Sequence, residues 1–225
     1  MSHYTWDKNT RYITQRDDTV GNLSKDLIEG FLTAWDGFWT VWMSQLLWIG
    51  LCLPVVTIPA AFAGMYYIMH QLANGESLEW RTFFEGIKLY FWPAMRWAGI
   101  NLLVIASLGL YTLFLISSVN ISGQDWVQAA SGIPFGLLVI WLAVNAFTFP
   151  FMLVQENPSY RMALRNSLIL YLKWPVYALA FILVNAVVIG LSVWLVIPWL
   201  ILTTSFTALM ACVCVKNKAH QTQKA

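Results

Sequence analysis

Residues 174–215 read WPVYALAFILVNAVVIGLSVWLVIPWLILTTSFTALMACVCV, and none of these 42 residues is Asp, Glu, Lys or Arg. A helix needs about 20 apolar residues to cross the roughly 30 Å hydrocarbon core of a bilayer. The stretch is therefore long enough for two crossings, and Pro198 lies near its middle, where a turn would fall. This pattern predicts a pair of transmembrane helices.

Two further stretches extend this prediction to the rest of the chain. Residues 37–75 carry no charge apart from a possible one on His70, and residues 97–160 carry only Asp125 and Glu156. The whole chain is 11% charged, against about 25% in soluble domains. Its net charge of +2 is too small to indicate a nucleic-acid partner. The sequence thus predicts an all-α, multispan protein of the lipid bilayer.

The 13 Lys and Arg residues fall into four groups, which predict the orientation of the chain. Basic loops stay on the cytoplasmic side, so both termini and the two basic loops are expected inside the cell. The breaks at residues 120–131 and at Pro198 carry no basic residue and are expected outside. The four groups are Lys8, Arg11, Arg16 and Lys25; Arg81, Lys88 and Arg96; Arg161, Arg165 and Lys173; and Lys216, Lys218 and Lys224.

The first hydrophobic stretch must then enter and leave the membrane on the same side. The run from Leu53 to Pro59, LPVVTIP, supplies a break, because each proline removes a backbone donor and disfavours helix in the residue before it. A tight hairpin or a re-entrant pair of helices would satisfy this pattern. The alternative is one long kinked span with the N-terminus outside, which reduces the number of spans to five.

The predicted architecture is a polytopic membrane helix bundle with about six hydrophobic segments in three hairpins. The hairpins cover about residues 38–72, 94–154 and 175–215, within a single membrane domain over residues 23–216. Residues 1–22 form a polar N-terminal extension, and residues 217–225 form a polar tail. A polar or amphipathic stretch precedes each hairpin, and the dipeptides Trp92-Pro93 and Trp174-Pro175 mark the junction in two of them.

The stretch 80–91 is predicted to form an amphipathic helix on the cytoplasmic surface. Its apolar residues recur at helical spacing, while charged residues occupy the other face. The apolar face either rests among lipid headgroups or docks a partner subunit, since buried aromatic anchors dominate interface energetics. The candidate contact residues are Trp80, Phe83, Phe84, Ile87 and Phe91. A similar stripe before the first hairpin consists of Leu27, Phe31, Ala34, Trp35 and Phe38.

The predicted spans carry amides and hydroxyls but no ionisable group, which pumps and proton-coupled carriers usually have. Asn101, Asn145 and Asn185 lie in three different spans. They predict either interhelical hydrogen bonds, worth about 1 kcal/mol each, or a polar seam that meets a partner or a sugar-like solute. Cys212 and Cys214 would point about 200° apart on a helix, which suits neither a shared metal nor a disulfide. No catalytic or cofactor motif is found, so neither enzymatic activity nor a cofactor is expected.

Several short motifs in the first half of the chain occur together in a known family. Leu46-Leu47-Trp48 precedes LPVVTI at residues 53–58, Met65-Tyr66-Tyr67 follows, and Phe83-Phe84 comes before Lys88 and Phe91. In this the chain resembles the YesL family of bacterial integral membrane proteins, classed as domain of unknown function 624. The similarity covers about residues 31–104 well and the later hairpins by hydropathy only. The chain differs at Pro59, where the family usually has Gly, in fewer basic residues on the 83–91 helix, and in its longer polar N-terminus.

The resemblance implies no established activity, but members of that family typically accompany carbohydrate-utilisation genes and sugar importers. The first functional hypothesis is therefore a non-enzymatic accessory or interaction subunit in the bacterial cytoplasmic membrane, associated with a carbohydrate importer. A small stand-alone solute transporter and a structural subunit of an energy-transducing membrane complex are the alternatives.

Overall fold

The computed structural model describes residues 19–76, 79–122, 125–155, 157–194 and 200–223. Within these ranges it contains eight α-helices and one short 3-10 helix, so the predicted all-α class is confirmed. The elements are α1 (Thr19–Asp36), α2 (Phe38–Cys52), η1 (Val55–Thr57), α3 (Ile58–Ala73), α4 (Trp80–Ser122), α5 (Asp125–Leu153), α6 (Tyr160–Lys173), α7 (Pro175–Trp194) and α8 (Leu200–Gln223).

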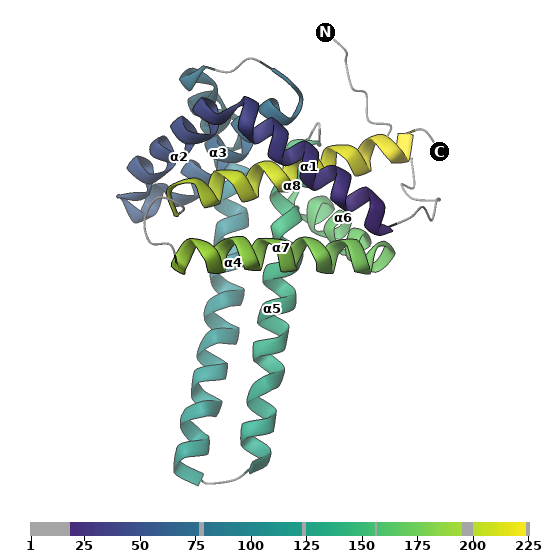
Figure 1. The fold of residues 1–225 in the computed structure, drawn as a ribbon. Helices are drawn as coiled ribbons and strands as arrows, with labels where there is room; N and C mark the ends of the chain where they lie inside the picture. Colours follow the sequence, from purple (N-terminus) through teal and green to yellow (C-terminus); the bar gives the residue numbers. More distant parts are fainter. Residues whose placement is uncertain (1–18, 77–78, 123–124, 156, 195–199, 224–225) are drawn as a thin grey trace.

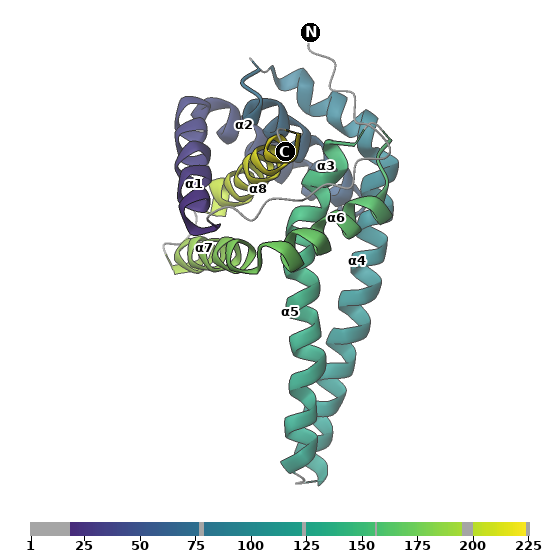
Figure 2. The same cartoon turned by 90° about the vertical axis from the view of Figure 1, so that its right-hand side faces the viewer.

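The helices form a head and a long projecting hairpin (Figure 1). α4 and α5 pack against each other and leave the head together. The head contains the other helices, the first part of α4 and the last part of α5. Both α7 and α8 run across the direction of the hairpin, as the two perpendicular views show (Figure 2). The chain is therefore not a bundle of six parallel rods.

α8 lies at the centre of the head, and its side chains from Ala208 to Val215 are all buried. Leu209 and Cys212 belong to a core cluster shared with α2, α3, α4 and α5, whereas Met210 and Cys214 belong to a second cluster shared with α5, α6 and α7. The apolar stretch of α8 is thus covered by protein on opposite sides. The two thiols point to different clusters, as their spacing predicts.

The predicted break after Leu53 is present. α2 ends at Cys52, and Pro54 is extended, with φ −82° and ψ 117°. The Thr57 hydroxyl donates a hydrogen bond to the Pro54 carbonyl at 2.7 Å, and α3 begins at the next residue. α2 packs against α3. The segment is therefore a pair of short helices in contact, not one long kinked helix.

The two Trp-Pro dipeptides behave differently, which corrects the prediction that both are junctions. Pro93 lies inside the continuous helix α4, so the expected helices 80–91 and 94–119 are one helix. Trp174, in contrast, has φ −126° and ψ 65°, and α6 and α7 meet there at 105°. Trp174 is buried beneath the Lys218 ammonium, 5.0 Å from the ring centroid, whereas Trp92 is 70% exposed. Burial of the tryptophan therefore accompanies the bend, and proline alone does not impose it.

Two of the described helices, α4 and α5, are long and apolar enough to cross a membrane, and a third crossing results if the bent pair α6 and α7 counts as one span. These long apolar helices indicate a membrane protein. The structure does not show the six predicted spans. α2 and α3 have 15 and 16 residues, or about 23 Å each at 1.5 Å per residue. That length is shorter than the hydrocarbon core.

Candidate functional site

The five candidate contact residues at the start of α4 do not form one exposed face. Phe83 is fully buried, and Ile87 packs against the main core cluster. Trp80, Phe84 and Phe91 remain at the surface. Phe83 is therefore an internal packing residue and is not available to a partner in this structure. Partner contact by the three exposed aromatics stays a prediction.

Glycines explain why Phe83 faces inward. A Cβ atom at Gly64 on α3 would lie 2.8 Å from both the Phe83 carbonyl oxygen and a carbon of its ring. A Cβ atom at Gly86 on α4 would lie 2.5 Å from the Tyr67 Cβ. Each helix thus contributes a glycine into which an aromatic residue of the other helix fits. The first part of α4 is consequently fixed to α3 instead of lying free on a surface.

The stripe predicted on residues 27–38 is divided, because Ala34 is buried while Phe31, Trp35 and Phe38 are exposed. The buried face of α1 carries Asp26, Gly30 and Ala34, at helical spacing of four, while Phe31 and Trp35 are exposed. Trp35 is 72% exposed and Trp39, at the start of α2, is 71% exposed. We call the exposed set on these two helices the α1–α2 aromatic face. It consists of Phe31, Trp35, Phe38, Trp39 and Trp42.

Of the three predicted seam amides, Asn101 takes part in an interhelical hydrogen bond, whereas Asn145 and Asn185 bond carbonyls of their own helices. The Trp141 indole Nε1 donates to Asn101 Oδ1 at 2.9 Å, which links α5 to α4. Asn145, one turn further along α5, donates to the Trp141 carbonyl at 2.9 Å. Asn185 on α7 donates to the Phe181 carbonyl of its own helix. The interhelical role predicted for the amides thus applies to Asn101. Its partner, Trp141, was not among the predicted residues.

A second polar contact joins α2 to α8 inside the main core. The Gln45 side-chain oxygen accepts hydrogen bonds from the Ser205 backbone N–H at 2.9 Å and from the Ser205 hydroxyl at 2.7 Å. The Ser44 hydroxyl lies 3.2 Å from that of Ser205. All three side chains are buried. Because buried polar groups need partners, this contact fixes the register of α2 on α8.

A third polar cluster is centred on Asp26, which was not predicted. Its Oδ2 accepts a hydrogen bond from the Tyr177 hydroxyl of α7 at 2.7 Å, and its Oδ1 accepts one from Asn217 Nδ2 of α8 at 2.8 Å. The Lys218 ammonium lies 4.6 Å from the Tyr177 ring centroid. Asp26 is 5% exposed. The cluster therefore joins α1, α7 and α8.

Burial raises the pKa of Asp26 above its ordinary value. The hydrogen bonds from Tyr177 and Asn217 and the nearby Lys218 ammonium lower this pKa, and the carboxylate of Glu29 raises it. Desolvation is the largest of these effects. A sequence signal for this site did exist, since Asp26 shares a helix face with the small residues Gly30 and Ala34. Three residues from distant helices could not be paired without the fold.

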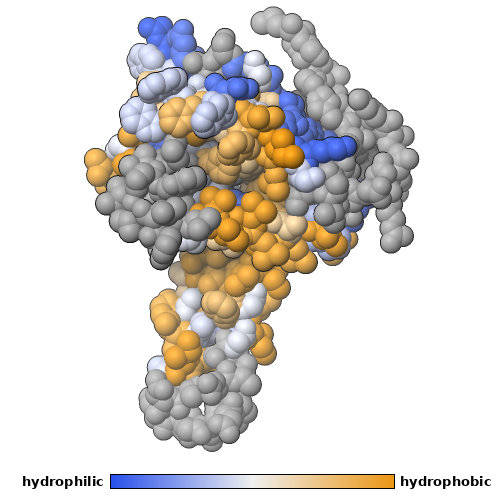
Figure 3. All heavy atoms as spheres, viewed as in Figure 1, coloured by the Kyte–Doolittle hydropathy of each residue, from blue (hydrophilic) through white to orange (hydrophobic). Residues whose placement is uncertain are grey.

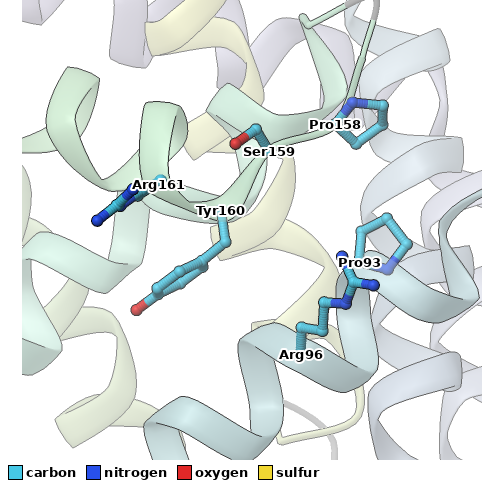
Figure 4. A pocket seen from close by; sticks show the side chains of 6 residues that line it. All are labelled: Pro93, Arg96, Pro158, Ser159, Tyr160 and Arg161. Atoms are coloured by element: carbon cyan, nitrogen blue, oxygen red, sulfur yellow. The ribbon is translucent and has the colours of Figure 1, made fainter.

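A pocket of about 280 Å³ lies where α4 passes the start of α6. Two arginines line it, but they do not converge (Figure 4). The Arg96 guanidinium faces Pro158, whereas the Arg161 guanidinium and the Tyr160 hydroxyl point away from Arg96. The lining therefore does not form a set of groups aimed at one ligand. The lining residues are Pro93, Arg96, Pro158, Ser159, Tyr160 and Arg161.

Within the described ranges, His, Cys, Asp and Glu do not gather in any group of three that could hold a metal ion. The polar groups that the structure does bring together, at Asp26, Gln45 and Asn101, each connect different helices. Their common effect is to position helices relative to one another.

Comparison with known proteins gives one match. Residues 41–113 match the model of the family described as "Protein of unknown function, DUF624". The match runs from α2 through α3 to the middle of α4, and it confirms the resemblance over this part of the chain. No curated protein and no solved structure matches the chain.

Proposed function

We propose that this chain, which carries a DUF624 domain of unknown function over residues 41–113, is a non-enzymatic accessory subunit of a membrane complex. In this proposal the α4–α5 hairpin crosses the bilayer, the head lies at the cytoplasmic surface, and the α1–α2 aromatic face docks a partner membrane protein. The partner is a carbohydrate importer.

The projecting hairpin is the observation that carries the proposal. Beyond Asn101, no α4 side chain that the structure describes is buried, and Leu103 and Leu110 are 73% and 67% exposed. Hydrophobic surface continues from the head down the described part of the hairpin (Figure 3). A two-helix hairpin cannot cover such side chains by itself. Lipid or neighbouring transmembrane helices must therefore surround it.

The charge distribution supports a cytoplasmic head. Among residues 97–154 the only charged side chain is Asp125, at the tip of the hairpin. Lys88, Arg165 and Lys216 all lie on helices of the head. Since basic segments remain cytoplasmic, the head belongs inside the cell and the tip outside.

The α1–α2 aromatic face supports a protein partner. Tryptophan and phenylalanine are enriched where proteins bind each other, because they bury large areas at low entropic cost. Phe38, Trp39 and Trp42 contact one another edge-on, with ring centroids 6.0 Å apart in each successive pair. This surface contains three exposed tryptophans, Trp35, Trp39 and Trp42, against two, Trp80 and Trp92, at the start of α4. We therefore place the principal docking site on α1 and α2.

The importer and the non-enzymatic role have separate support. The link to sugar import comes from the family resemblance alone. The buried hydrogen bonds of Asp26, Gln45 and Asn101 each join different helices. Such structural contacts suit an interaction subunit. The six-segment arrangement, with α2, α3, α7 and α8 also crossing, remains an alternative topology for the same role. A stand-alone transporter or a subunit of an energy-transducing complex remains an alternative function.

Affinity purification in mild detergent, followed by identification of the bound proteins, tests this proposal. We expect an importer membrane subunit to co-purify with the wild type and to be lost from the Trp35→Ala/Trp39→Ala variant. The matched control, Trp80→Ala/Trp92→Ala, removes two tryptophans exposed elsewhere on the head and should keep the partner. Loss only from the control would move the docking site to α4. Solute flux through the purified chain alone would support the transporter instead.

A further inference from the structure

We propose that α7 lies flat in the membrane interface instead of crossing the bilayer. One face of the helix packs on the head, and the opposite face contacts lipid at the boundary between headgroups and acyl chains. The inference rests on the proposed insertion of the α4–α5 hairpin. It extends that proposal by assigning a second membrane-contacting element and the depth at which it lies.

The length of the hairpin sets the level of the bilayer. The last buried side chain described on α4 is Asn101, and on α5 most side chains are buried from Val144 onward. At 1.5 Å per residue, residues 102–122 extend about 31 Å and residues 125–143 about 28 Å. The hydrocarbon core of a bilayer is roughly 30 Å thick. When the tip reaches the far interface, the near interface therefore falls where the hairpin leaves the head.

α7 lies at that level. The Phe181 ring of α7 packs on Phe147 of α5, with centroids 4.5 Å apart, and Phe147 is one turn above Val144. In both views α7 lies at the end of the head from which the hairpin projects, and it runs across the hairpin direction (Figures 1 and 2). α7 also packs on α1 and α8. Its free face is thus turned toward the membrane.

The side chains of α7 divide into a buried face and an exposed face. Tyr177, Ala178 and Phe181 are buried against the head. The opposite stripe, at helical spacing, is apolar and more than half exposed, and it consists of Val176, Leu179, Leu183 and Val187. This stripe continues the lipid-facing surface of the hairpin. Because the rest of α7 is covered by the head, this exposed apolar stripe is the part of the helix available to the acyl chains.

Polar and charged groups hold α7 in this orientation. The Tyr177 hydroxyl donates to Asp26 on the head side of the helix. At its N-terminal end, the buried Trp174 ring lies 5.0 Å from both the Lys173 and the Lys218 ammonium, which fixes this end of α7 to the head. With its 20 residues, α7 is long enough to cross a bilayer. A crossing would move most of the helix away from α1 and α8.

Depth measurements distinguish the two arrangements. The experiment uses three variants, each with one cysteine labelled with a bimane fluorophore. The cysteine replaces Leu179, Leu183 or Val187, and the native Cys52, Cys212 and Cys214 are removed. The protein is reconstituted in vesicles of phosphatidylcholine and phosphatidylglycerol that contain lipid nitroxides at a shallow or a deep acyl position. Leu110→Cys in the hairpin serves as the deep control, and Asp36→Cys on the exposed surface of α1 serves as the aqueous control.

We expect all three α7 positions to be quenched mainly by the shallow nitroxide, with the same ratio of shallow to deep quenching. Leu110→Cys should be quenched mainly by the deep nitroxide, and Asp36→Cys by neither. In a spanning helix, positions 179 and 187 would differ in depth by about 12 Å, so a graded ratio would overturn the inference while leaving hairpin insertion intact. An unquenched Leu110→Cys would instead overturn the insertion, and with it the inference.

Discussion

Gly64 of α3 lies against Phe83 of α4 with no room for a side chain. The position is helical, so alanine would be favoured there by about 1 kcal/mol on intrinsic propensity alone. A Cβ atom would, however, lie 2.8 Å from the Phe83 carbonyl oxygen, which belongs to the backbone and cannot move aside like a flexible side chain. Steric conflict therefore outweighs propensity at this residue.

We predict that Gly64→Ala lowers the free energy of unfolding by about 1–3 kcal/mol, the usual cost of overpacking. The matched control is Gly99→Ala on α4, where a new Cβ atom would meet nothing within 4 Å. The control should be neutral or slightly stabilising, because it gains only helix propensity. Thermal unfolding in detergent measures both variants. Equal stability of the two would mean that α3 and α4 are not packed as closely as described.

The buried carboxyl group of Asp26 predicts that the free energy of unfolding depends on pH. Its pKa is raised by burial from the ordinary value of 3.8, so the folded protein binds the proton more tightly than the unfolded chain. The stabilisation from this group is complete below pH 3.8 and is lost as the pH rises through the raised pKa. Asp26→Asn should therefore gain stability relative to the wild type as the pH rises over this window.

Unfolding in detergent at several pH values checks this prediction. Asp36→Asn removes an exposed carboxylate from the same helix and serves as the matched control. If Asp26→Asn instead became relatively less stable as the pH rises, the hydrogen bonds from Tyr177 and Asn217 would outweigh burial.

At the scale of elements, the position of most helices follows from the sequence. The LPVVTIP run ends α2 and begins α3 as predicted, since proline there removes donors that a continuous helix needs. Which face of a helix is buried was harder to predict. α1 turns Asp26 inward and Trp35 outward, because the carboxylate finds two hydrogen-bond donors on α7 and α8. Periodicity in one helix contains no information about such partners.

The amide seam gives a prediction about paired elements. Trp141→Phe should leave Asn101 Oδ1 without its donor on α5 and lower stability by about 1 kcal/mol, as for other interhelical hydrogen bonds in membranes. Asn185→Ala removes a bond within α7 only, so it should change stability much less. A double-mutant cycle between Trp141→Phe and Asn101→Ala isolates the pair energy. A coupling energy of zero would show that the two helices are not joined there.

At the scale of the whole molecule, hydropathy predicts a membrane protein but not how its apolar helices are placed. α8 and α5 are similarly apolar in sequence from residue 200 to 215 and from 133 to 154. α8 is nevertheless covered by protein, while much of α5 is exposed. A helix buried in a protein core and a helix surrounded by lipid need the same apolar side chains, because the protein core and the lipid hydrocarbon both exclude water. Counting apolar stretches therefore cannot by itself distinguish a spanning helix from a helix in the hydrophobic core of a head.

The side of the membrane on which Val56 lies, between α2 and α3, distinguishes the two topologies of the whole chain. It is 78% exposed at the end of the α2–α3 pair. If only the α4–α5 hairpin crosses, Val56 stays on the cytoplasmic side with Lys88. If α2 and α3 also cross, it emerges on the same side as Gln124, a position predicted to be outside that lies beyond the described residues. Single cysteines at these three positions, in a background without native cysteines, report the side through a membrane-impermeant maleimide.

We expect Gln124→Cys to react in intact cells, and Lys88→Cys and Val56→Cys to react only after the cells are opened. The reason is length as well as burial, since α2 and α3 are each shorter than the hydrocarbon core and both pack on α8. Reaction of Val56→Cys in intact cells, with Lys88→Cys still protected, would mean that the bilayer surrounds the helices of the head. The exposed aromatics of α1 and α2 would then face lipid instead of a partner.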